Sequence, residues 1–231
     1  MYKPLLISLV AFISFQGLFC QAHIKCGRDK HSYCLPLAPR TEWGTKFPPN
    51  EDEMKELCPT AQGYFECLAD YKKICPDPLF DPTDETVVAT LQIIREICNE
   101  TSAMHRDYVR NSECYKSIAA SDVGPECESK AEIMYNAYVL HRIEYDSIYD
   151  ADRTRHRYCM EEAYKLACVS MEMVETCGIQ AYNTFLELVH RSKFLQPICY
   201  GSTKEELNHE FIEFVYEDEE QQQIFNRAFN A

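Results

Sequence analysis

Between about residues 51 and 200, apolar residues recur every three or four positions, the spacing that places side chains on one face of an α-helix. The first such segment follows Pro59 and carries Tyr64, Phe65, Leu68, Tyr71 and Ile74. Proline suits the first position of a helix, because its missing N–H has no intrahelical acceptor there. We therefore expect this helix to begin near Pro59.

A second apolar stripe opens with Asp81-Pro82-Thr83-Asp84, which supplies an N-cap residue, a proline at the first helical position and an acidic first turn. The stripe itself consists of Val87, Val88, Leu91, Ile94 and Ile97. Further helices are expected at about 102–118, 126–150, 155–176 and 179–195, with Gly178 as a natural helix stop. Strand-like alternation is scarce, so the pattern predicts an all-α fold.

The two ends of the chain have a different pattern. Residues 1–22 are typical of a secretory signal, with Lys3 before an apolar stretch and a small residue, Ala22, before the expected cleavage point. The proline-rich stretches within residues 23–50 predict an extended arm. No later apolar run approaches the roughly 18 residues that cross a bilayer. We therefore expect a secreted, extracellular product without a transmembrane segment.

Residues 201–231 form an acidic tail. An amphipathic stretch that includes Leu207, Phe211 and Phe214 precedes the run Glu217-Asp218-Glu219-Glu220. Two interpretations are open: a final helix docked on the domain, or a mobile acidic end.

Thirteen cysteines interrupt the helical pattern, and their spacing is duplicated. Cys20 lies in the leader, which leaves an even set in the mature chain. Steps of 9, 8 and 23 residues separate Cys58, Cys67, Cys75 and Cys98, and steps of 9, 9 and 22 separate Cys159, Cys168, Cys177 and Cys199. We therefore expect residues 51–200 to form a disulfide-linked helical domain with an internal duplication, a bundle built from two helical-hairpin modules at 58–98 and 159–199.

The symmetry of each module predicts one disulfide. Cys58 and Cys98 are centred on residue 78, within the first expected turn, and Cys159 and Cys199 are centred on residue 179, next to Gly178. Residues equidistant from the turn of an antiparallel hairpin are neighbours, so we expect these pairs to bond. Cysteines nine residues apart in one helix, such as Cys58 and Cys67, cannot bond to each other, because they lie about 13 Å apart along the helix axis. The inner cysteines of the modules must therefore bond to other elements: Cys67, Cys75, Cys168 and Cys177. The remaining cysteines are expected to link the arm and the middle helices to the domain: Cys26, Cys34, Cys114 and Cys127.

The cysteines are expected as disulfides rather than metal ligands, because the chain has no Cys-x-x-Cys spacing and exported thiols are oxidised. His209 and Glu213 share one helical face, but a single His–carboxylate pair is an incomplete metal site. The glycines are scattered, and no G-x-S-x-G elbow is present. We assign no catalytic residue, no metal ligand and no cofactor, and expect a protein that is not an enzyme.

The chain is strongly acidic. Its formal net charge of −14 becomes −15 when the leader, with Lys3, is removed. Such a surface repels nucleic acid, so no nucleic-acid partner is expected; it favours solubility or a basic partner. Asn99-Glu100-Thr101 is a glycosylation sequon in a predicted loop between helices, which predicts a glycan on Asn99.

Two residue groups are candidates for contact with a ligand. An aromatic stripe on the expected 126–150 helix either packs in the core or lines a cavity for an apolar ligand: Tyr138, Tyr145 and Tyr149. A basic cluster either binds an anion or glycan or forms a charged helix start beside acidic neighbours: Arg153, Arg155, His156 and Arg157.

Residues 58–200 resemble the arthropod 27-kDa haemolymph glycoprotein family and a related cysteine-rich domain of unknown function in nematodes and arachnids. The resemblance depends on the cysteine spacing and a few other positions: Cys58-Pro59, Cys67, Tyr71, Cys75, Cys98, Arg106, Tyr108, Cys114, Cys127, Cys159, Cys168, Cys177-Gly178 and Cys199. It implies a secreted, helical, disulfide-bonded protein of body fluid or glandular secretion, with no established enzymatic activity. The arm with Cys26 and Cys34 and the acidic tail have no counterpart in that pattern.

These features together predict a non-enzymatic extracellular protein of body fluid or gland that binds an unknown extracellular protein or a small apolar ligand. One alternative is a venom or salivary effector whose acidic face binds a basic receptor or channel. A glandular structural component is a further alternative, which the low glycine count and the lack of short repeats disfavour.

Secretion from insect cells tests the processing that the sequence predicts. We expect a chain that begins after Ala22, carries one enzymatically removable glycan and is twelve hydrogens lighter than its fully reduced form. Denaturing mass spectrometry before and after deglycosylation and reduction measures all three. A titratable free thiol in the unreduced protein would contradict the six-bridge prediction.

Overall fold

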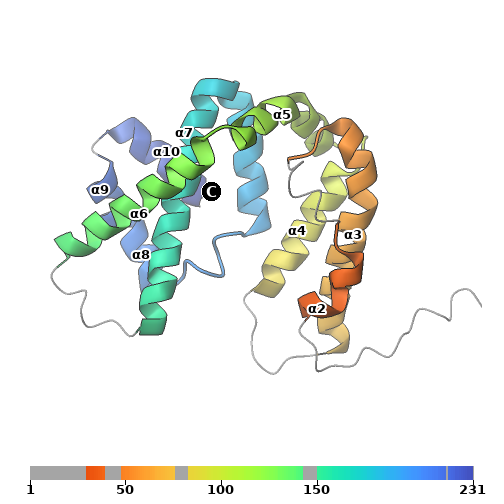
Figure 1. The fold of residues 1–231 in the computed structure, drawn as a ribbon, viewed down its shortest axis with the longest axis horizontal. Helices are drawn as coiled ribbons and strands as arrows, with labels where there is room; N and C mark the ends of the chain where they lie inside the picture. Colours follow the sequence, from red (N-terminus) through yellow and green to blue (C-terminus); the bar gives the residue numbers. More distant parts are fainter. Residues whose placement is uncertain (1–29, 40–47, 76–82, 143–149, 217, 231) are drawn as a thin grey trace, which may run out of the picture.

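The computed structural model describes residues 30–39, 48–75, 83–142, 150–216 and 218–230, and all the regular elements in these ranges are helical. The predicted all-α, disulfide-rich fold is therefore confirmed (Figure 1). The elements follow one another as α2 (Lys30–Cys34), η1 (Leu35–Leu37), α3 (Glu51–Ile74), α4 (Thr83–Ile97), α5 (Ala103–Ala120), α6 (Val123–His141), α7 (Asp150–Ser192), α8 (Ser202–Glu206), η4 (Leu207–Phe211), α9 (Ile212–Val215) and α10 (Glu219–Asn230).

α3 begins at Glu51, so the expected helix start near Pro59 is wrong. The start is fixed by a capping box: the Glu53 N–H donates to the Asn50 side chain at 3.1 Å, and the Asn50 N–H donates to the Glu53 carboxylate at 2.9 Å. Both bonds satisfy backbone donors that have no intrahelical acceptor. Pro59 lies inside the helix, where it removes one backbone hydrogen bond without ending the helix.

The proline-rich arm is helical in part, which corrects the expectation of an extended chain. α2 and η1 are short helical segments, and the backbone becomes extended at the cap residue Ala38, with φ −60° and ψ 145°. Pro36 fits the first turn of η1 because its fixed φ is close to a helical value. The Cys34–Cys67 disulfide fastens this segment to α3, and Cys34 is fully buried.

α3 and α4 lie side by side as the first hairpin (Figure 1). Cys58 is bonded to Cys98, the pair that the symmetry of the module predicts. An ion pair of 2.7 Å between Arg95 and Glu66 also joins the two helices.

The second hairpin is folded from α7 itself. Gly178 has φ 80° and ψ 171°, a backbone conformation that residues with a Cβ rarely adopt. It divides α7 into residues 150–177 and 179–192, which pack alongside each other (Figure 1). Cys159 is bonded to Cys199, as the module symmetry predicts.

Two long-range disulfides fix this hairpin to the middle helices. Cys177, next to the break, is bonded to Cys114 of α5, and Cys168 is bonded to Cys127 of α6. The inner cysteines thus reach other elements, as predicted. Cys75 is also disulfide-bonded, and Cys26 lies outside the described residues.

The acidic tail is docked on the domain. α10 and η4 bury Leu207, Phe211 and Phe225 against Met160 and Tyr182 of α7 in the largest apolar cluster. The interpretation of a docked final helix is therefore correct for the described part of the tail.

One helix end in the middle of the chain agrees closely with the expected one and another does not. α5 ends two residues later than expected, at Ala120. α6 ends at His141, nine residues before the expected end at about 150, because the backbone becomes extended at Arg142, with φ −93° and ψ 104°. Residues 143–149, which were expected to continue that helix, lie outside the described ranges. Within the described ranges, every helix is too short or too polar to traverse a lipid bilayer.

The break at Gly178 predicts a strong effect of a single methyl group. Gly178→Ala should lower the free energy of unfolding by about 1–3 kcal/mol, because alanine is strained at this φ and ψ although nothing lies within 4 Å of the added Cβ. Gly63→Ala, at an equally open position inside α3, should instead raise it by about 0.5–1 kcal/mol. Urea unfolding with intact disulfides measures both. Equal effects of the two substitutions on the free energy of unfolding would show that the backbone conformation at Gly178 does not require glycine.

Candidate functional site

A cavity of about 700 Å³ lies between α5, the start of α6 and the two halves of α7. This volume is within the range of about 300–1000 Å³ that is usual for small-molecule sites. Its wall is mostly apolar or aromatic: Pro48, Tyr108, Tyr115, Ile118, Ala119, Gly124, Leu166, Val169, Met173, Phe185, Leu188, Val189 and Phe194.

The tyrosines of the cavity wall contribute ring surface, because their hydroxyls are bonded to the backbone. Tyr108 donates to the carbonyl of Pro49 and Tyr115 to the carbonyl of Ala181, each at 2.9 Å. Their ring centroids are 5.7 Å apart. Burial raises the pKa of Tyr115 to about 12 and raises that of Tyr108 as well, so both phenols are neutral at physiological pH.

One ion pair interrupts the apolar wall. Lys165 and Glu162, one turn apart on α7, approach to 2.5 Å between Nζ and Oε1. The Glu162 side chain is 14% exposed and that of Lys165 34%. They are the only charged residues among those that line this cavity.

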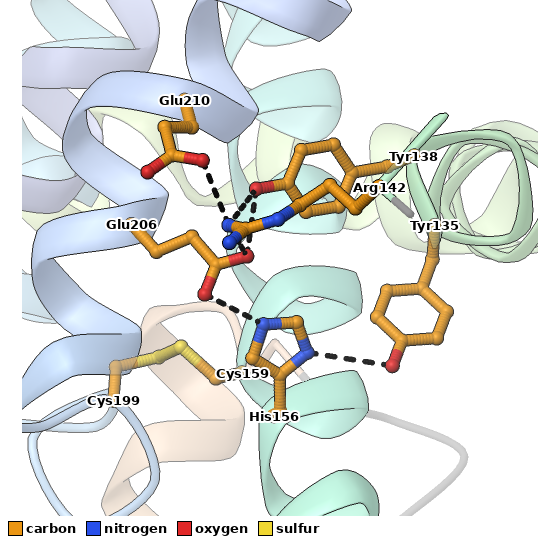
Figure 2. A network of polar contacts seen from close by, with 8 residues as sticks. All are labelled: Tyr135, Tyr138, Arg142, His156, Cys159, Cys199, Glu206 and Glu210. Carbon is orange, nitrogen blue, oxygen red and sulfur yellow. Dashed lines mark hydrogen bonds and ion pairs between the residues drawn. A yellow bond between two sulfur atoms is a disulfide. The ribbon is translucent and has the colours of Figure 1, made fainter. Parts of the chain in front are cut away.

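A second polar cluster lies around His156, near the start of α7 (Figure 2). Glu206 of α8 is its centre: Oε1 accepts a hydrogen bond of 2.7 Å from Tyr138 and an ion-pair contact of 2.6 Å from Arg142, and Oε2 lies 3.1 Å from Nε2 of His156. Arg142 also contacts Glu210 at 2.7 Å. The Tyr135 hydroxyl is 3.4 Å from Nδ1 of His156, whose side chain is buried.

Electrostatics keep Glu206 ionised. Burial alone would raise the pKa of this carboxyl, but the contacts with His156 and Tyr138 and the charge of Arg142 outweigh burial and hold the pKa below its ordinary value. Burial raises the pKa of Tyr138 and keeps its hydroxyl protonated as a donor. The cluster joins α6, α7 and α8, and none of its members lines the cavity. It therefore fastens the tail to the rest of the domain.

Tyr138, the described member of the tyrosine stripe, does not line the cavity. Tyr138 is 2% exposed and packs edge-on against Phe211 at 5.1 Å, so it belongs to the core. Tyr145 and Tyr149 lie outside the described residues.

The basic cluster at the start of α7 is used in contacts within the chain. The Arg155 guanidinium lies 4.3 Å from the ring centre of Tyr200, and Arg157 contacts Glu161 at 2.7 Å and Glu132 at 3.1 Å. The structure thus favours a charged helix start over an anion site.

The other predicted positions are on the surface. His209 and Glu213 are exposed, and the described part of the chain contains no group of three His, Cys, Asp or Glu side chains placed to hold a metal ion. Asn99 is exposed between α4 and α5, where its side-chain oxygen accepts hydrogen bonds from the N–H and the hydroxyl of Thr101. This geometry leaves Asn99 accessible for a glycan.

The cavity residues were not recognised from the sequence. Tyr108 and Tyr115 are seven residues apart and share a face of α5, and Glu162 and Lys165 are an i, i+3 pair. These spacings are common in helices and do not indicate a site. The residues line one cavity because α7 folds back on itself and packs against α5.

Comparisons with known proteins give no match: no family model, no curated protein and no solved structure resembles the chain at the level of significance required. The site must therefore be interpreted from its own geometry.

The Glu206 cluster predicts a pH-dependent contribution to stability. Glu206→Gln should lower the free energy of unfolding by about 1–3 kcal/mol at pH 7, because Arg142 and His156 lose the charge that they contact. Since the pKa is lowered in the folded state, this contribution is present above about 4.5, the ordinary value, and is lost as pH falls through the folded-state pKa. Wild type and variant should therefore converge in acid, as measured by urea unfolding between pH 3 and 7.

A matched control contacts the same arginine. Glu210 is 59% exposed, so Glu210→Gln should cost less than about 1 kcal/mol at pH 7. A Glu206→Gln effect that is equally small, or that persists unchanged at pH 3, would contradict the role given to Glu206.

Proposed function

We propose that this chain is a secreted, non-enzymatic protein of body fluid or gland that carries a small apolar ligand in the cavity between α5 and α7. The observation that carries the proposal is the cavity itself: about 700 Å³, with a wall that is apolar or aromatic except at one ion pair and Ser192. An apolar molecule that fills it would regain the dispersion contacts that the wall residues lack and would remove apolar surface from water.

Covalent cross-links join the helices that line the cavity. Cys114–Cys177 joins α5 to the turn of α7, and Cys127–Cys168 joins α6 to the half of α7 that supplies Leu166 and Val169. Walls fixed in this way lose little freedom when a ligand binds, which favours affinity. This rigidity supports a carrier.

Export is supported by the disulfides and by the sequence. Five disulfides join described residues, and such bridges persist in an oxidising compartment. The resemblance to haemolymph glycoproteins favours body fluid, and the exposed Asn99 suits a glycosylated surface. A carrier in such a fluid benefits from the kinetic durability that cross-links of about 2–4 kcal/mol each provide.

Filling the cavity with a larger side chain tests the proposal. Val169 is partly buried in the cavity wall, so Val169→Trp should occupy the space of a ligand. Val88→Trp, at a 48% exposed position on α4 outside the cavity, is the matched control. We expect the wild type and Val88→Trp to bind the neutral fluorescent probe Nile red with similar affinity and Val169→Trp to bind it at least tenfold more weakly.

Fluorescence titration measures the affinities, and thermal melting by circular dichroism checks that both variants fold. A folded wild type that does not bind the probe would contradict the proposal. So would a folded Val169→Trp variant that binds it as tightly as the wild type, because the probe would then occupy another surface.

A further inference from the structure

The inference that follows depends on the carrier function proposed above, and it concerns the chemical class of the ligand. We infer that the ligand is an apolar molecule with one neutral hydroxyl group, such as a long-chain alcohol or a sterol, and that this hydroxyl binds the Glu162–Lys165 pair. The apolar body then fills the space between α5 and the second half of α7.

The Glu162–Lys165 pair is the part of the cavity wall that can both donate to a ligand and accept from it. Three hydroxyls in the wall already donate their protons to backbone carbonyls and can only accept from a ligand: Tyr108 to Pro49 and Tyr115 to Ala181 at 2.9 Å, and Ser192 to Val189 at 2.6 Å. The charged atoms of Glu162 and Lys165 keep hydrogen-bonding capacity beyond their mutual contact, since an ammonium has three donors and a carboxylate about four acceptor positions. A ligand with several polar groups would leave most of them unpaired against apolar side chains, which costs free energy.

The ion pair also selects the charge of that polar group. A ligand carboxylate would compete with Glu162 for Lys165, and a ligand ammonium would compete with Lys165 for Glu162. Either would weaken a 2.5 Å pair and leave a charge without its partner, and this is most costly for Glu162, which is only 14% exposed. A hydroxyl can donate to Glu162 and accept from Lys165 while the pair stays intact.

The net charge of the whole chain also disfavours binding of an anionic ligand. A formal net charge of −14 repels a fatty-acid carboxylate at long range. A neutral ligand is neither attracted nor repelled by this net charge. Local pairing and overall charge therefore both favour an alcohol over an acid, while local pairing disfavours an amine.

A set of four twelve-carbon compounds tests the inference: dodecanol, dodecane, dodecanoic acid and dodecylamine, each at pH 7.4 and below its solubility limit or, for the acid and the amine, its micelle concentration. Their affinities are measured by displacement of Nile red from the secreted, disulfide-intact protein. We expect dodecanol to bind the wild type about tenfold more tightly than dodecane, the gain of a hydrogen bond to a charged partner, and more tightly than the acid or the amine.

The double variant Glu162→Leu/Lys165→Met removes the pair and keeps the wall apolar, so the alcohol-to-alkane ratio should fall to about one. Asp70→Leu/Lys73→Met removes an exposed i, i+3 acid–lysine pair of the same kind on α3 and should keep the wild-type ratio. An intact preference for dodecanol in the Glu162→Leu/Lys165→Met variant, or a wild type that prefers the acid, the amine or the alkane, would overturn the inference.

A different result would show that the carrier proposal itself is wrong. In that case Nile red itself does not bind the folded wild type, and no preference among the four compounds exists to be measured.

Discussion

Gly178 turns α7 back on itself, and the rest of the structure is arranged around that turn. With φ 80° and ψ 171° it separates two halves of one helix, which then pack side by side. One half presents Leu166 and Val169 to the cavity and the other Phe185 and Leu188. A straight α7 would place these pairs far apart, so the cavity exists because the chain reverses at this residue.

The disulfides convert this reversal into a rigid frame. Cys114–Cys177 holds the turn against α5, and Cys159–Cys199 closes the opposite end of the hairpin. The tail is held separately, by apolar packing on α7 and by the ionised Glu206, which contacts both α6 and α7. Helices joined by Cys114–Cys177 and Cys127–Cys168 line the cavity, whereas no residue of the Glu206 cluster does. Ligand binding and acid sensitivity should therefore be largely independent.

Signals that are local in the sequence predicted much of the fold. The 3.6-residue period gave the helical class, and the symmetry of each module led to Cys58–Cys98 and Cys159–Cys199, the pairs that the structure contains. Pro59 is a misleading signal: proline is common at the first position of a helix, but the capping box at Asn50 begins α3 eight residues earlier. In the arm, Pro36 indicated an extended chain, although the Cys34–Cys67 bridge and a tight helical turn suit it equally well.

The cavity could not be predicted in this way, because its walls meet only in three dimensions. Tyr115 bonds to the carbonyl of Ala181, 66 residues away, and no periodicity within α5 or α7 encodes that contact. Of the two interpretations that the sequence left open for the tyrosine stripe, core packing is the correct one for Tyr138, whose ring is buried and whose hydroxyl donates to Glu206.

The most direct test of the account is a native mass spectrum of the protein as insect cells secrete it, compared with the denaturing spectrum of the same sample. We predict a native mass that exceeds the glycosylated, fully bridged chain by a discrete small-molecule increment, and that loses this increment on denaturation. An empty chain that also remains empty after incubation with apolar alcohols would contradict the claim that the cavity between α5 and α7 is a ligand site.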